Sequence, residues 1–436
     1  MRKVFLVLFI SCAALLPSIK LGSGLPTLRP EMLVLPLAFM AGHFRLVFDD
    51  RISKLLFLFL GISNVAILAS YTAFGAPFDA NDLSIIPMLV QYWLIYSFGK
   101  GLSDPRDRTM LISSIPLVVA TAALVGIAQK YNIGRVNDWL TPLYLDDIET
   151  QDFILQALRE ELPFGRIVGT VGDPRHFAYL LALGVGAAIA SLLNRKAGAI
   201  SSIVIVGAMF LCLGASFLCQ SRTGVAAIGL QFCIAVYFYS KRTGNLVMPL
   251  VVASVFSVVA AISWLQFSDE AMSERLFMDS SAMMESSGYA RVRDFQTPFA
   301  KSLENPLILV TGMGPSKALL PGSSHGEIGW VVLRYGLGGL FVYGSILYWT
   351  SRRSMVLYRK AQTRNDAVAA MFFVIVMSVW ILYCSAESIF KLPSLMSINM
   401  LVIGMVFGFK TKRGQDWTIG RKRGIPRKSV NSAGSI

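Results

Sequence analysis

Charged residues and histidines are scarce in this sequence of 436 residues. Only 15% of the residues are Asp, Glu, Lys or Arg, against 54% that are hydrophobic, which excludes an ordinary soluble protein. Three histidines are too few for a His-rich zinc site. The five cysteines all lie in apolar runs, and the long polar segments contain none. We therefore expect neither a disulfide framework nor a metal centre.

Long apolar runs recur along the chain. A hydrocarbon core of about 30 Å requires about 20 apolar residues per helix, and lipid-exposed backbone must satisfy its own hydrogen bonds. The sequence therefore predicts an all-α polytopic membrane protein with about twelve transmembrane helices. We expect them at 4–19, 30–47, 54–75, 82–99, 109–129, 174–194, 198–219, 223–240, 246–267, 327–350, 366–386 and 393–410. The first run lacks a small-x-small cleavage site, which predicts a retained signal anchor.

The distribution of Lys and Arg orients these helices. If both termini are cytoplasmic, the short inner segments are almost purely cationic, as the positive-inside rule requires, and most carboxylates lie outside. The net charge of +14 is then mainly a topology signal. Basic residues spread over several inner loops form no single face, which argues against a nucleic-acid partner. We expect a membrane domain over 1–410 and a basic, disordered cytoplasmic tail over 411–436 that contacts anionic headgroups.

Two long outer loops, at about 130–173 and about 268–325, interrupt the succession of helices. Long loops in a compact protein usually serve function. Each contains apolar residues at helical spacing, in "TQDFILQALREEL" and in "YARVRDFQTPFAKSL". We expect these amphipathic helices to lie on the outer membrane surface or to cap the bundle. The sequence shows no internal repeat, which weakens the case for a transporter built from symmetric halves.

Basic residues gather where the outer loops meet the helices, although the positive-inside pattern disfavours them there. They are Arg166, Arg175, His176, Arg222, Arg291, Arg293 and His325. Arginines beside helix N-termini suit phosphate or pyrophosphate. The turn Gly312-x-Gly314 can also expose backbone N–H groups to an anion. For any single arginine, the alternative is an ordinary ion pair with an outer carboxylate.

The stretch "SSHGEIGWVVLRYGLGGL" contains two charged residues inside an expected helix. Glu327 and Arg334 are seven residues apart, so we expect both on one side of that helix, with Arg334 about 10 Å below its start. A lone arginine at such depth costs a few kcal/mol unless it has a partner or an aqueous cavity. A tie to Glu327, a tie to a neighbouring helix and a substrate role all remain open. The glycines of "GLGGL" indicate close helix packing.

Several of these motifs follow one another in a recognisable order. The patterns "R-x-x-G-T…D-P-x-x-F-A", "S-R-T-G" and a long loop ending in "G-x-G…H" resemble the superfamily of O-antigen ligases and Wzy-type polysaccharide polymerases. His325, Gly336 and Gly339 match that family's H-x-x9-G-x-x-G pattern. The sequence departs from it at Gly326, where ligases more often carry Asn, Ser or Gln. The resemblance covers about 166–340 and the expected twelve-helix topology.

The resemblance implies a metal-independent, GT-C-like glycosyltransferase without a cofactor. Such an enzyme acts on undecaprenyl-pyrophosphate-linked oligosaccharide at the periplasmic face of the bacterial inner membrane. By this resemblance His325 is the base on the acceptor hydroxyl, and Arg222 and Arg291 contact the pyrophosphate. We add Arg166 as a further contact. The chemistry agrees, because histidine titrates near neutral pH and fixed arginines stabilise a departing pyrophosphate. Supporting candidates are Arg293, Arg175, His176, Glu327 and Arg334.

Three functions follow from these features. The first is a polymerase that adds the growing O-antigen or exopolysaccharide chain to the next lipid-linked repeat unit. The second is an O-antigen ligase that transfers the finished glycan to lipid A–core. The third is a lipid or saccharide transporter, although that class requires more polar residues at mid-membrane than Arg334. The expected partners are the lipid-linked oligosaccharide, membrane lipids, and a chain-length regulator and a flippase of the same pathway.

Overall fold

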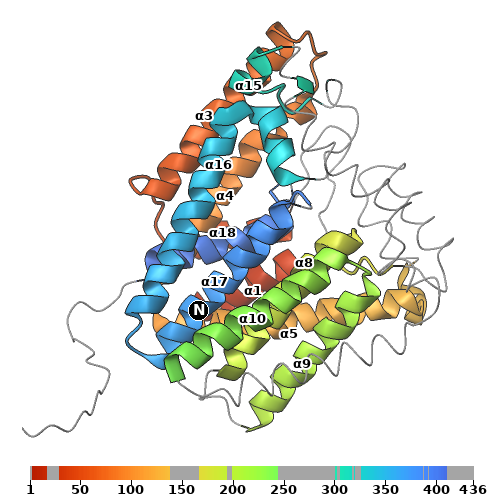
Figure 1. Cartoon of the computed structure of the whole chain (residues 1–436), viewed down its shortest axis with the longest axis vertical. Helices are drawn as coiled ribbons and strands as arrows, with labels where there is room; N and C mark the ends of the chain where they lie inside the picture. Colours follow the sequence, from red (N-terminus) through yellow and green to blue (C-terminus); the bar gives the residue numbers. More distant parts are fainter. Residues whose placement is uncertain are drawn as a thin grey trace, which may run out of the picture.

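Helices are the regular elements of this protein. The computed structural model describes residues 2–16, 29–137, 166–193, 199–243, 300–301, 305–316, 319, 326–385, 387–390 and 392–409, and this part contains no strand (Figure 1). The predicted all-α class is confirmed. Seven described helices are long and apolar enough to cross a membrane. They are α3 (Arg51–Thr72), α5 (Pro105–Lys130), α8 (Pro174–Leu193), α9 (Ala199–Leu218), α10 (Arg222–Thr243), α16 (Glu327–Lys360) and α17 (Arg364–Cys384).

Four shorter helices coincide with further apolar runs of the sequence. They are α1 (Arg2–Leu15), α2 (Pro30–Met40), α4 (Ile85–Gly101) and α18 (Pro393–Gly408). With 11 residues, α2 covers only about 16 Å, which is too short to cross a hydrocarbon core alone. The structure also contains the short helices η1 (Ala80–Ser84), η2 (Ile133–Arg135) and α15 (Leu307–Thr311). The expected helix at 246–267, the tail at 411–436 and most of both long loops lie outside the described residues.

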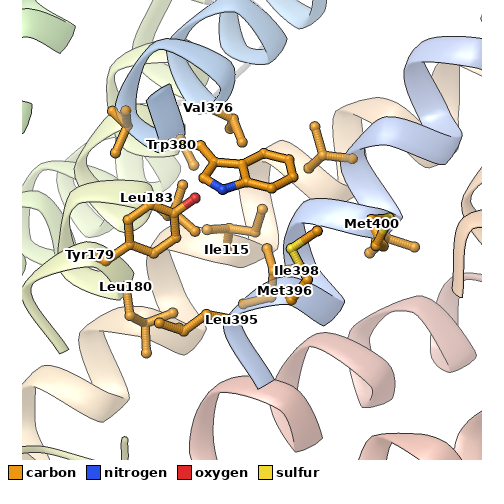
Figure 2. Close-up of a cluster of buried hydrophobic side chains, with 14 of the residues drawn as sticks. Ile115, Tyr179, Leu180, Leu183, Val376, Trp380, Leu395, Met396, Ile398 and Met400 are labelled. Atoms are coloured by element: carbon orange, nitrogen blue, oxygen red, sulfur yellow. The ribbon is translucent and has the colours of Figure 1, made fainter. Parts of the chain in front are cut away.

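The two central helices are α8 and α17, of whose spans 94% and 83% are buried. Figure 2 shows part of this core, where Tyr179 of α8 and Trp380 of α17 lie with Met396 of α18. The Tyr179 hydroxyl donates to Asn399 Oδ1 at 2.8 Å, so two buried polar groups satisfy each other. In contrast, only 39% of the α9 span is buried, and Ile200 is 80% exposed. Such an apolar exposed surface suits contact with lipid.

Contacts between helices fix their relative directions. Ser191 near the end of α8 bonds to the carbonyl of Ile112 in the first half of α5, so these two helices are antiparallel. Gln231 of α10 bonds to the carbonyl of Ala182, and α8 and α10 both begin at the same end of the bundle. We call this end, which carries the starts of α8 and α10, the site end. The opposite end carries the start of α17.

The tightest helix contact joins α4 and α18. A methyl group on Gly404 would lie 2.3 Å from the carbonyl oxygen of Tyr96, and one on Gly99 would lie 2.3 Å from that of Leu401. Gly404 and Gly408 have the small-xxx-small spacing that lets two backbones approach in a membrane. Glycine therefore sets the distance between α4 and α18.

Candidate functional site

Helix α16 is two helical arms joined at Gly336. This residue has φ 64° and ψ −169°, a conformation that is essentially restricted to glycine. Glu327 and Tyr343 both contact the Cys384 sulfur at 3.1 Å, although an unbroken helix would separate them by about 24 Å. The first arm (residues 327–335) therefore folds back beside the second (residues 337–360), and Figure 1 shows the two cyan arms side by side. The expectation of one continuous helix is wrong here.

A distant segment satisfies the backbone groups that this break exposes. In a continuous helix, the carbonyls of Leu333 and Arg334 would accept from residues 337 and 338. Here they accept from the N–H of Met313 at 2.7 Å and of Gly314 at 3.1 Å. The N–H of Gly312 donates to the carbonyl of Ile308. All three N–H groups of this turn are thus used within the protein, so the predicted anion site at Gly312-x-Gly314 is wrong.

Arg334 lies at the bend rather than below the start of the helix. Its Nη1 donates to the carbonyl of Pro315 at 2.6 Å, and its guanidinium lies 5.2 Å from the Trp330 ring. The Asp82 carboxylate is its nearby opposite charge, and Tyr71 donates to that carboxylate at 3.1 Å. Burial raises the pKa of Asp82, while the hydrogen bond from Tyr71 and the charge of Arg334 oppose this rise. Arg334 therefore ties the bend to neighbouring elements, not to Glu327.

Glu327 lies deep in the bundle, with no exposed surface. One carboxylate oxygen accepts the backbone N–H of Phe390, and the other accepts the Cys384 thiol at 3.1 Å. The Tyr343 hydroxyl lies 3.1 Å from the same sulfur. These contacts hold the start of the first arm against the end of α17 and the segment before α18. The arm therefore begins in the interior and reaches its bend at Gly336.

Arg166 and Arg222 both lie at the site end. Arg166 Nη2 donates to the carbonyl of Gln220 at 2.9 Å, and the N–H of Ile167 donates to that of Leu218. The segment before α8 therefore runs along the turn between α9 and α10. Arg222 is the first residue of α10 and is exposed. Two residues predicted to contact pyrophosphate thus share one end of the bundle.

Arg175 and His176 belong to an ion-pair network at the start of α8. Asp173 caps this helix, because its Oδ1 accepts the N–H of Arg175 at 2.7 Å and of His176 at 3.2 Å. Arg175 bridges Asp173 at 3.2 Å and Glu387 at 3.1 Å. Burial alone would raise the pKa of Asp173, but the charges of His176 and Arg175 outweigh it and lower the pKa to about 2. This network joins α8 to the segment after α17.

The remaining predicted residues are His325, Arg291 and Arg293, and all three lie outside the described residues. Within the described ranges, no three His, Cys, Asp or Glu side chains gather closely enough to hold a metal ion. Sequence reasoning missed Asp82 and Cys384. Cys384 stands in an apolar run and carries no sequence signal, whereas Asp82 begins one and could have been noted as a buried acid.

These contacts define an all-helical protein whose apolar helices suit a membrane, with cationic side chains at the site end. No protein-family model matches the chain, and no curated protein matches it. The arrangement of its own residues therefore carries the functional argument.

Proposed function

We propose that this protein is a polysaccharide polymerase of the glycosyltransferase class. It transfers a growing glycan from undecaprenyl pyrophosphate to the next lipid-linked repeat unit, at the periplasmic face of a bacterial inner membrane. The observation that carries the proposal is the hydrogen bond from Arg166 to the carbonyl of Gln220, which brings Arg166 beside the turn that leads into Arg222. A guanidinium group at the start of α10 and a second one beside the turn that leads into it suit a pyrophosphate, which carries several negative oxygens.

The reaction requires a base and a site for the leaving group. The acceptor hydroxyl oxygen forms the new bond to the sugar carbon, while the bond from that carbon to the pyrophosphate breaks. His325 takes the hydroxyl proton, and undecaprenyl pyrophosphate departs with the bonding electron pair. The arginines stabilise the charge that develops on it, so no covalent intermediate is required. The predicted base and arginines thus supply both functions.

The other candidate residues hold parts of the protein in place and take no part in the reaction itself. Arg175 is bridged by Asp173 and Glu387, so its charge is already matched within the protein. Glu327 anchors the chain two residues after His325 through Cys384 and the N–H of Phe390. We therefore assign Arg175, His176 and Glu327 as residues that hold helix starts in place, and Arg334 as the residue that holds the bend.

Purified protein with lipid-linked repeat unit alone provides the test, with products sized on a gel. A ladder is expected for the wild type. Arg222→Ala is expected to lower the rate of glycan transfer about 100-fold or more. This is the usual effect of removing a group that stabilises charge in the transition state. Arg222→Lys should recover only part, because a point charge replaces a planar fork. Arg352→Ala is the matched control, because Arg352 is exposed and stacks on Trp349 in the second arm of α16.

The alternatives predict different products. A ligase gives no ladder until lipid A–core is added, and a transporter moves labelled lipid without forming a glycosidic bond. His325→Ala is expected to insert correctly and to lose transfer activity. Normal glycan length and yield from that variant would refute the assigned base. A chain-length regulator and a flippase are the proposed protein partners, and adding the regulator should change the ladder length without changing its spacing.

A further inference from the structure

A cavity of about 230 Å³ lies between four helices at the end of the bundle opposite the site end. Its walls come from the end of α8, from α10, from the end of α16 and from the start of α17. Its lining includes Leu193, Phe238, Tyr358, Arg364, Val368 and Met371. The proposed glycosyl transfer uses none of these residues. The cavity is thus a mostly apolar space with one cation in its wall.

Two contacts hold the walls of this cavity together, one between α16 and α10 and one between α17 and α8. The Tyr358 hydroxyl donates to the carbonyl of Phe238 at 2.6 Å, and the two rings lie 4.4 Å apart. The Arg364 Nε donates to the carbonyl of Leu193 at 2.9 Å, which fixes the guanidinium at the end of α8. The walls are therefore held by hydrogen bonds at defined places, and Arg364 is oriented by its own backbone contact.

The charge of Arg364 is not matched by an acid in the part of the chain that the structure describes. Asp366, two residues further on, instead pairs with Arg108 at 2.9 Å. Lys241 of α10 and Lys360 of α16 do not line the cavity, but they are exposed near the ends of the two helices that supply Phe238 and Tyr358 to its wall. Arg364 is therefore the one charged residue among the described residues that line the cavity, and further cations lie at the same helix ends.

We propose that this cavity binds one acyl chain of an anionic membrane phospholipid, with its phosphate at Arg364. The volume is below the roughly 300–1,000 Å³ of sites for drug-sized ligands, so it holds a segment of an acyl chain, and the mostly apolar lining suits such a segment better than a polar sugar. Arginine presents a planar fork that matches phosphate oxygens. Basic pockets between the ends of membrane helices are places where anionic headgroups bind. The lipid joins α10 to α16 and α17 and is independent of the glycan donor.

The test measures lipid binding directly, by native mass spectrometry of the purified full chain in detergent. The probes are phosphatidylglycerol and phosphatidylcholine with identical acyl chains, together with inorganic phosphate. Arg364→Gln removes the charge, Arg364→Lys keeps it, and Val368→Phe fills the cavity without a change of charge. Arg352→Gln is the control, because it removes an exposed arginine of α16 that does not line the cavity.

Phosphatidylglycerol is expected to bind more tightly than phosphatidylcholine. Arg364→Gln should weaken it about fivefold to tenfold, the effect of losing one cation near a headgroup. Arg364→Lys should restore most of this loss, Val368→Phe should weaken both lipids, and Arg352→Gln should change neither. Equal affinity for the two lipids, saturation by phosphate alone, or unchanged binding in Val368→Phe would overturn the proposal. If Arg364→Gln fails to fold, Arg364→Lys and Val368→Phe still decide the outcome.

Discussion

The bend in α16 depends on one glycine, and Gly336→Ala tests this dependence. At φ 64° and ψ −169°, a residue with a Cβ pays a backbone strain of about 1–3 kcal/mol. The added methyl would also lie 2.7 Å from the carbonyl oxygens of Leu309 and Val310. Opening the bend to relieve this overlap would break the hydrogen bonds from Met313 and Gly314, each worth about 1 kcal/mol. We expect a total loss of stability of about 3–5 kcal/mol.

Two measurements reveal this loss. The melting temperature in detergent should fall clearly below that of Gly344→Ala, a control in the second arm where a methyl group meets nothing within 4 Å. The control should gain up to about 1 kcal/mol, since alanine favours a helix over glycine. Cys384 provides the second measurement. Its thiol is covered by Glu327 and Tyr343 as long as the two arms of α16, which form a helical hairpin, lie against each other. Its reaction with a maleimide should be faster in Gly336→Ala.

The maleimide experiment uses a background in which the exposed Cys233 and the half-buried Cys12 are replaced by serine. The proposed role of Gly336 is refuted if two results are found together. They are a melting temperature of Gly336→Ala equal to that of Gly344→Ala, and a wild-type rate of maleimide labelling at Cys384.

Three further predictions concern the polar contacts. The pKa of Asp173, about 2, lies below its ordinary value of 3.8, so its stabilising contribution is present above about pH 4 and is lost as the pH falls toward 2. Asp173→Asn should cost about 1–2 kcal/mol at pH 7 and flatten the melting temperature over that window, and an unchanged acid profile would contradict the stabilising charge interactions of Asp173 with His176 and Arg175. Glu327→Ala leaves the N–H of Phe390 without its acceptor and should lower the stability by about 2–3 kcal/mol. Equal melting temperatures for Glu327→Ala and the wild type would show that the contact is dispensable. Arg108→Met breaks the pair between the buried Arg108 and the half-buried Asp366 and should destabilise by about 2–4 kcal/mol, while the exposed Arg106→Met should melt like wild type.

The sequence located most helices because each is a long apolar run, but it misjudged where some end. The run at 30–47 continues past the end of α2, which stops at Met40. Just after this end, Gly42 has φ 69°. The N–H of Gly42 donates to the carbonyl of Phe39, and the N–H of His43 donates to the carbonyl of Ala38. This is the glycine-ended helix stop known as the Schellman motif. The signal was present in the sequence, and the apolar residues after Gly42 obscured it.

The hairpin of α16 could not be predicted from the local sequence. Residues 327–350 have the composition of one apolar helix, and the fold-back needs hydrogen bonds from Met313 and Gly314 as well as Gly336. In contrast, the turn between α9 and α10 could be anticipated from the sequence. The location of Arg166 and Arg222 at the same end could therefore be predicted. The pairing of Arg175 with Glu387 joins residues far apart in the chain, and no periodicity indicates such a partner.

The short first arm of α16 has a consequence for how this protein matures. Residues 327–335 cover about 13 Å, less than half of a hydrocarbon core, so the insertion machinery cannot place them as a span of their own. The arm needs Phe390 and Cys384, which are made after it, before it has a surface to pack on. Insertion and final packing are therefore separate events for this protein. A variant that breaks the hairpin would enter the bilayer with its other helices correctly oriented and be lost only to later quality control.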